Sequence, residues 1–155
     1  MTTTMEEMEV GAKVPTFTCI DQDGDVFTSE DLAGMPYVLY FYPQNETPGC
    51  TQEACDFRDN LEEIEEMGIT VVAISPDTVA SHQSFSKNHF LDFTLLSDES
   101  KETCRLFDVV TEENTIDRTT FIVDSTGTIQ WMERPAKVNG HVKRVMKAIK
   151  DLGLE

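Results

Sequence analysis

The sequence predicts an α/β protein with a central mixed sheet flanked by helices, and three observations support this prediction. Two continuous apolar runs, 37–42 (YVLYFY) and 69–75 (ITVVAIS), are typical of strands that are buried on both faces. The segment between them carries apolar residues at helical spacing, namely Ala54, Phe57, Leu61 and Ile64. A strand, a helix and a second strand in this order favour parallel pairing of the two strands.

The remaining elements are expected in the following chain order. Strands over 16–20 and 26–28 form a hairpin around Asp21–Asp25, and a short helical turn runs from Ser29 to Gly34. The long helix runs from Thr47 to Met67, and after the second strand a helix capped by Asp77 ends near Phe90. A strand over 93–96 and a short helix over 101–107 follow. The chain then forms a hairpin over 120–124 and 128–132 and a last helix that is capped by Asn139 and ends at Leu152. This is the order of a thioredoxin-like fold with an N-terminal β-hairpin extension.

Chain length and the N-terminal residues set the expected organisation. The 155 residues suit one domain, over 10–155, preceded by a flexible tail over 1–9. The tail is acidic and lacks the zones of a signal peptide, and no apolar run is long enough to cross a bilayer. We therefore expect a cytoplasmic protein without a membrane partner.

The net charge of −17 is the strongest compositional feature. So much negative charge argues against binding to nucleic acid or to anionic membranes. An acidic, solvated surface is also what a high-salt cytoplasm favours, so we expect a halophilic source. Measuring the stability of the protein from low to molar KCl tests this expectation.

Four cysteines are present, and their spacing argues against a metal site. There is no CxxC pair and no histidine at zinc-finger spacing, so neither a metal nor another cofactor is expected. Cys19 and Cys104 are expected to be small buried residues. Surface positions are expected for the three histidines, namely His82, His89 and His141.

Cys50 lies where the first buried strand gives way to the long helix. With Thr47 as N-cap and Pro48 at the first helical position, Cys50 occupies the first turn. Free backbone N–H groups and the helix dipole stabilise an anion there, and thiols in such places can have a pKa of roughly 3.5–7.5. A cysteine at a helix start is more often a small buried residue, but Pro43 as a pocket wall, the Thr47 hydroxyl and the second thiol of Cys55 favour a reactive one.

The spacing of Cys50 and Cys55 predicts a conformational change if the two form a disulfide. On an ideal helix, residues five apart have Cα atoms roughly 8–9 Å apart, whereas a disulfide needs less than about 7 Å. The first turns of the helix must therefore unwind before the bond can form. The alternative is that Cys55 is only a core residue of the helix.

The stretch 41–59 (FYPQNETPGCTQEACDFRD) resembles the active-site segment of peroxiredoxins, and most closely that of the Q-type or bacterioferritin-comigratory subgroup. Similarity extends over nearly the whole chain, including segments 11–15, 73–76, 95–98 and 118–124. The resemblance implies reduction of hydrogen peroxide and organic hydroperoxides, without a cofactor and with recycling by thioredoxin or a similar dithiol. A monomer is expected, with a dimer as the alternative.

The resemblance also implies roles for individual residues. The proline, threonine and attacking cysteine of the family fall on Pro43, Thr47 and Cys50, and its active-site arginine falls on Arg118. The resolving cysteine of one Q-type pattern falls on Cys55. Glu53 matches a recurrent glutamate that steadies the arginine, whereas Gln44 and Asn45 depart from the pattern and are expected to face no chemistry.

Two other functions compete with the peroxidase interpretation. A thioredoxin-type disulfide reductase requires CxxC at this helix start, which the sequence lacks. A redox-sensing or chaperone-like module could use the same pair of cysteines as a switch, and such a protein reacts with peroxide without sustained turnover.

Overall fold

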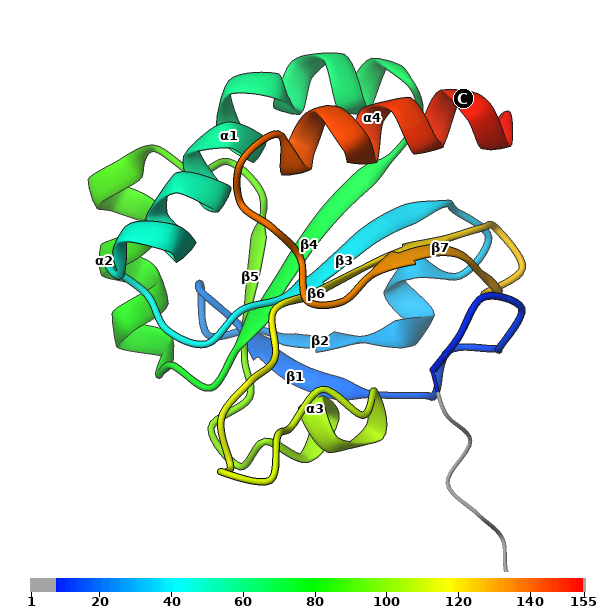
Figure 1. Cartoon of the computed structure of the whole chain (residues 1–155). Helices are drawn as coiled ribbons and strands as arrows, with labels where there is room; N and C mark the ends of the chain where they lie inside the picture. Colours follow the sequence, from blue (N-terminus) through cyan, green and yellow to red (C-terminus); the bar gives the residue numbers. More distant parts are fainter. Residues whose placement is uncertain (1–7, 155) are drawn as a thin grey trace, which may run out of the picture.

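A seven-stranded mixed sheet runs through the middle of the computed structural model, which describes residues 8–154 (Figure 1). Its strands are β1 (Thr18–Asp21), β2 (Val26–Thr28), β3 (Tyr37–Phe41), β4 (Thr70–Ser75), β5 (Thr94–Ser97), β6 (Thr119–Val123) and β7 (Ile129–Glu133). They lie in the order β2-β1-β5-β4-β3-β6-β7. β3, β4 and β5 pair in parallel, and β6 pairs antiparallel with β3. The predicted parallel core and the N-terminal hairpin β1–β2 are confirmed.

Helices cover both faces of the sheet, as the predicted thioredoxin-like fold requires (Figure 1). They are the short 3₁₀ helix η1 (Ser29–Leu32), α1 (Pro48–Glu66), α2 (Val79–His89), α3 (Glu102–Leu106) and α4 (His141–Leu152). Side chains of α1, α2 and α4 form one core with one face of the sheet, and those of η1 and α3 form a second core on the other face. All five residues of β3 are buried, because helices cover both of its sides.

Two of the predicted helix caps are wrong. α2 is capped by Thr78, whose hydroxyl accepts a hydrogen bond from the Ser81 backbone N–H, and not by Asp77. The Asp77 carboxylate accepts hydrogen bonds from the backbone of Asn45 and the hydroxyl of Ser75 instead. The cap position of α4 is Gly140, with φ of 71°, and not Asn139; this left-handed conformation suits glycine.

The predicted flexible tail over 1–9 falls largely outside the described residues, which begin at Met8. Met8 itself is buried in the second core, next to the sheet. Within residues 8–154, no helix has the length and apolar character needed to cross a membrane.

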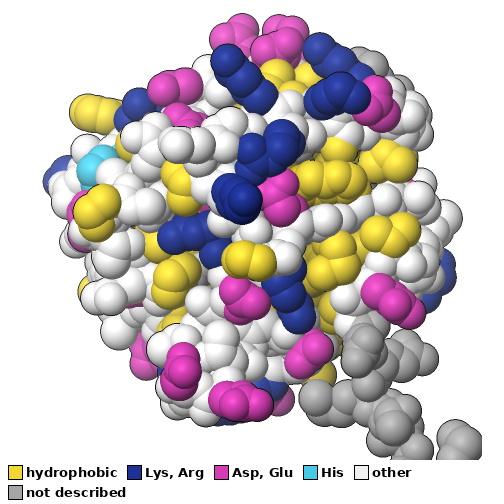
Figure 2. Space-filling model, in the orientation of Figure 1, with side chains coloured by type: hydrophobic (Ala, Val, Ile, Leu, Met, Phe, Trp, Pro, Cys, Tyr) yellow, Lys and Arg dark blue, Asp and Glu magenta, His cyan; other side chains and the backbone are white. Residues whose placement is uncertain are grey.

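Charge is distributed unevenly over the helices. The exposed side of α1 carries acidic residues, namely Glu62, Glu63, Glu65 and Glu66. The exposed side of α4 carries Lys143, Lys147 and Lys150 instead. Figure 2 shows Lys and Arg side chains gathered over α4 and the loop that leads into it. Two neighbouring helices of this acidic protein therefore present surfaces of opposite sign.

Candidate active site

Cys50 occupies the first turn of α1, as predicted, and its side chain is only 1% exposed. Thr47 holds the N-cap position and Pro48 begins the helix. The first backbone hydrogen bond at this end runs from Thr51 N to Thr47 O at 2.8 Å, and among the described residues the N–H groups of Gly49 and Cys50 have no acceptor. These free amides and the helix dipole favour negative charge at the Cys50 sulfur.

The Thr47 hydroxyl is not used as a helix cap. It donates a hydrogen bond to Gln44 O at 2.9 Å, within the loop that connects β3 to α1. This contact occupies the hydroxyl proton and leaves the oxygen lone pairs free to accept a hydrogen bond. Pro43 lies exposed directly beyond the buried Tyr42 at the end of β3.

Arg118 reaches Cys50 because of the strand order. Phe41, the last residue of β3, pairs with Thr119, the first residue of β6. Arg118 precedes β6, so it lies beside the chain segment that leads from β3 to Cys50. Its Nη2 donates a hydrogen bond to Cys50 Sγ at 3.3 Å.

The same guanidinium binds a buried carboxylate. Arg118 Nη1 donates to Glu53 Oε1 at 2.6 Å, and the two side chains are 17% and 0% exposed. Although burial acts to lower the pKa of Arg118, the charges of Glu53 and Cys50 outweigh it and raise the pKa above its usual value. Arg118 therefore stays cationic beside the sulfur. The position of Glu53 agrees with the steadying role that the resemblance implies.

Gly49 allows this close approach, which the sequence analysis did not foresee. A Cβ at this position would lie 3.2 Å from Arg118 Nη2 and 3.7 Å from Val138 Cγ2. The first of these distances is tighter than an ordinary contact, so a side chain there would push on the nitrogen that binds Cys50. A glycine immediately before the candidate nucleophile was the only available signal.

Two of the three histidines are not at the surface, and that expectation was wrong. His82 and His141 are both 0% exposed, because they lie on the inner sides of α2 and α4. His141 Nδ1 lies 3.1 Å from Glu53 Oε2. His89 is partly exposed and bonds Glu46 Oε1 at 2.7 Å.

Asn45 is also buried, and its contacts are structural. Its side chain accepts a hydrogen bond from the Tyr42 hydroxyl at 2.6 Å and donates one to Ser81 Oγ at 3.0 Å. Its Nδ2 lies 3.0 Å from His82 Nδ1. These contacts tie the loop before α1 to helix α2, and thereby fix the start of the helix that carries Cys50.

The remaining cysteines differ in environment. Cys55 is half-buried on the same helix as Cys50, and all four cysteines of the structure are free thiols. Cys19 and Cys104 are buried, as predicted. Burial raises the pKa of Cys19 to about 11 and that of Cys104 well above its usual value. Neither of these two thiols ionises near neutral pH.

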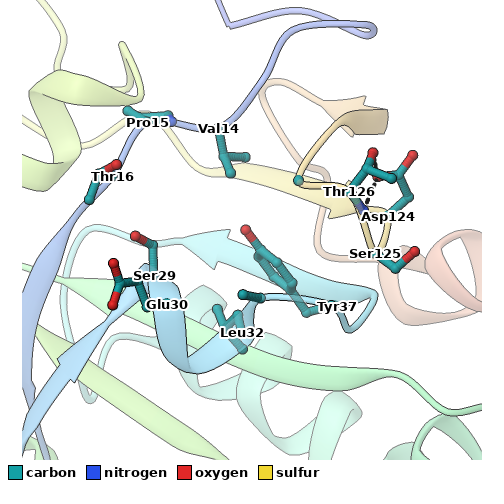
Figure 3. A pocket seen from close by; sticks show the side chains of 13 residues that line it. Val14, Pro15, Thr16, Ser29, Glu30, Leu32, Tyr37, Asp124, Ser125 and Thr126 are labelled. Carbon is teal, nitrogen blue, oxygen red and sulfur yellow. Dashed lines mark hydrogen bonds between the residues drawn. The ribbon is translucent and has the colours of Figure 1, made fainter.

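Other surface features lie apart from Cys50. A hollow of about 210 Å³ is lined by Val14, Ser29, Tyr37 and Asp124 among others, and contains neither Cys50 nor Arg118 (Figure 3). Three carboxylates gather in the β1–β2 turn, where the side chain of Asp21 accepts hydrogen bonds from the backbone N–H groups of Asp23 and Asp25. The folding of the turn accounts for this cluster.

Comparison with known proteins defines the class of this protein. A family model for the AhpC/TSA family matches residues 10–132. Peroxiredoxin Bcp of Bacillus subtilis is 36% identical over 152 residues, which cover 94% of this chain and 97% of that protein. The chain therefore belongs to the AhpC/TSA family.

Solved structures narrow the assignment. A mutant of Xylella fastidiosa PrxQ superposes with a TM-score of 0.90 at 30% identity and covers 96% of this chain and 99% of that one. Bacterioferritin comigratory protein of Xanthomonas campestris, described for its alkyl peroxide reduction activity, matches with a TM-score of 0.84 at 35% identity over 87% of this chain and 90% of that one. These relatives place the chain in the peroxiredoxin Q/Bcp subgroup, whose members are thiol peroxidases. They are bacterial and give no support to a halophilic source, which stays a prediction.

Proposed function

We propose that this chain reduces hydrogen peroxide and organic hydroperoxides, with Cys50 as the attacking thiolate. The observation that carries the proposal is the contact of 3.3 Å between Arg118 Nη2 and Cys50 Sγ at the first turn of α1. A guanidinium, free backbone amides and a helix dipole all favour the ionised sulfur, which is the nucleophilic form. The alkyl peroxide activity of the Xanthomonas campestris relative supports organic hydroperoxides as substrates.

The first chemical step transfers one oxygen atom to sulfur. The Cys50 thiolate attacks the terminal oxygen of ROOH, a sulfur–oxygen bond forms and the O–O bond breaks. Sulfur loses two electrons and the peroxide gains them, so that after uptake of one proton the products are a sulfenic acid and ROH. Arg118 and the Cys50 N–H stabilise the negative charge that develops on the oxygens.

Thr47 and Pro43 complete the proposed site. Because the Thr47 hydroxyl already donates to Gln44 O, its oxygen is suited to accept the O–H of the incoming peroxide. Pro43 offers no backbone N–H that could compete for the substrate.

Cys55 is proposed as the resolving cysteine. Its thiol condenses with the sulfenic acid of Cys50, which forms a disulfide and releases water. Both cysteines lie in the regular part of α1, so this step requires its first turns to unwind. A thioredoxin-like dithiol then exchanges with the disulfide and restores both thiols.

Peroxide consumption by cysteine variants tests these assignments. Cys50→Ser should abolish consumption of hydrogen peroxide and of an alkyl hydroperoxide in stopped-flow mixing. Cys55→Ser should consume a single equivalent and leave a sulfenic acid that mass spectrometry detects. Cys19→Ala is the matched control and should cycle normally with thioredoxin. If Cys55→Ser also cycles normally, the resolving assignment is wrong; if the parent protein reacts but does not turn over, the redox-sensing alternative is favoured.

A further inference from the structure

A fully buried histidine lies behind the active-site ion pair. His141 is the first residue of α4 and 0% exposed, with its Nδ1 3.1 Å from Glu53 Oε2. Its ring packs edge-on against Phe57, with the ring centroids 5.6 Å apart. Neither ring nitrogen makes an aligned hydrogen bond with another described residue. A buried imidazole that has no aligned hydrogen bond and lies beside a carboxylate oxygen calls for a physical account, because leaving such a group unpaired is costly.

The histidine ends a chain of contacts that begins at the reactive sulfur. Cys50 Sγ accepts from Arg118 Nη2, and Arg118 Nη1 donates to Glu53 Oε1. The other oxygen of the same carboxylate faces His141 Nδ1. The links come from α1, from the residue before β6 and from the start of α4, so the three elements converge on one carboxylate.

Glu53 and Cys50 compete for the same guanidinium. A carboxylate with two free oxygens binds arginine in a bidentate manner, through two parallel N–H groups. Here the guanidinium is divided instead, with one terminal nitrogen on Glu53 and the other on Cys50. The division leaves the second oxygen of Glu53 without a hydrogen bond from the guanidinium, and His141 Nδ1 is the group that lies beside it, at 3.1 Å.

We propose that His141 is a positioning residue for the peroxidase reaction, which holds Glu53 Oε2 so that Arg118 Nη2 remains on the Cys50 sulfur. Without the imidazole N–H, Glu53 can turn and take both terminal nitrogens of Arg118. The sulfur then loses its cationic neighbour, and its ionised form becomes less favourable. This inference rests on the proposed role of Cys50 as the attacking thiolate.

The groups around Cys50 leave few other sources for such an effect. Two tyrosines approach from the sheet side, Tyr40 of β3 and Tyr42 directly after it, and burial raises the pKa of both well above the usual value. They stay neutral in the pH range of the reaction. The charged groups next to the sulfur are therefore Glu53 of α1 and Arg118, the residue before β6, and His141 faces Glu53 from α4. Glu133 of β7 also interacts electrostatically with His141, and Arg144 pairs with its carboxylate.

The test compares two replacements of His141. Asn places a side-chain N–H near the position of Nδ1, whereas Phe keeps the ring volume and its packing but has no donor. We expect His141→Phe to react with hydrogen peroxide about 10- to 100-fold more slowly at pH 7, since small displacements in an active site have effects of this size. The midpoint of its pH–rate profile should move to higher pH, and the rate of Cys50 alkylation by iodoacetamide should show the same shift. His141→Asn should stay within about threefold of the parent protein.

A packing control and a double variant separate positioning from a general loss of stability. Val145→Ala removes buried volume from the same helix and should leave the pH profile unchanged. If His141 acts through Glu53, His141→Phe should cause no further loss in a Glu53→Gln background. An unchanged profile in His141→Phe, equal losses in the Asn and Phe variants, or additive losses with Glu53→Gln would each overturn the proposal. If the Phe variant does not fold, His141→Gln replaces it in the comparison with His141→Asn, because the Gln N–H lies near Nε2 rather than Nδ1.

The alkylation readout keeps this inference distinguishable from the proposed function. It reports the ionisation of Cys50 whether or not the protein consumes peroxide. If Cys50→Ser still consumed peroxide, the proposed function would be wrong, and the alkylation profile of the histidine variants would still decide whether His141 acts on the thiol.

Discussion

Removal of Arg118 should destabilise the fold as well as slow the reaction. In Arg118→Ala, the sulfur loses its hydrogen-bond donor and the fully buried Glu53 carboxylate loses the guanidinium that pairs with it. Breaking a buried ion pair by removing one partner costs about 3–5 kcal/mol. Because Arg118 is itself 17% exposed and His141 remains beside the carboxylate, the lower end of that range applies.

The expected loss is therefore about 3 kcal/mol, out of a total stability of about 5–15 kcal/mol for a domain. In a protein of this length, each kcal/mol shifts Tm by about 2–4 °C, so the midpoint should fall by about 6–12 °C while the protein stays folded at room temperature. Thermal unfolding followed by circular dichroism measures the shift, and stopped-flow mixing with hydrogen peroxide measures the rate.

The double variant Arg118→Ala, Glu53→Gln separates the two effects. A neutral amide costs less to bury than an unpaired carboxylate, so about 2 kcal/mol of the stability should return. The peroxide reaction should remain slow, because no cation faces Cys50. If Arg118→Ala unfolds at the parent temperature, or if the second substitution restores no stability, the buried pair does not have the energetic role inferred from its geometry.

Three further predictions follow from single contacts. Gly49→Ala places a Cβ 3.2 Å from Arg118 Nη2, so the peroxide rate should fall about three- to tenfold with little change in unfolding free energy; an unchanged rate would contradict this. Burial lowers the pKa of His82, although Asp77 and a backbone carbonyl act against it. The unfolded chain therefore binds a proton at this histidine before the folded protein does, and the free energy of unfolding declines as the pH falls below about 6.5. Urea titrations of His82→Gln should show a shallower decline, and an equal slope would count against the assignment. Partial burial acts to raise the pKa of Asp124, but hydrogen bonds within its turn lower it to about 2. Asp124→Asn should lose about 1 kcal/mol of unfolding free energy at pH 7, and in acid titrations its stability should converge with that of the parent protein towards pH 2.

The sequence was sufficient to locate the helix that carries Cys50. A fully apolar run marks β3, and the Thr47-Pro48 pair and Gly68 delimit the helix, so all of these signals are local. Arg118 was assigned only through family resemblance, because it lies 68 positions from Cys50 and their contact depends on the antiparallel pairing of β3 with β6. No local pattern encodes that pairing.

Buried polar residues were the main failure of the sequence reading. Asn45 and His82 are buried because they satisfy each other within a network between two elements, which composition does not reveal. For His141, a signal was present in the sequence: Val142, Val145 and Ile149 follow it at helical spacing, so the apolar face of the last helix begins at the histidine. Adjacent polar residues such as Asp77 and Thr78 could not be ranked as caps, because the choice depends on which side chain is engaged elsewhere.

Glu53 lies between Cys50 and Cys55 on the same turns of α1. Any rearrangement that joins these two sulfurs must carry the intervening carboxylate away from both Arg118 and His141. A disulfide-bonded form would thus contain an arginine and a histidine that have lost their shared counterion. Each reduction would rebuild a buried charge arrangement as well as two thiols, which couples the refolding of this helix to readiness for the next peroxide molecule.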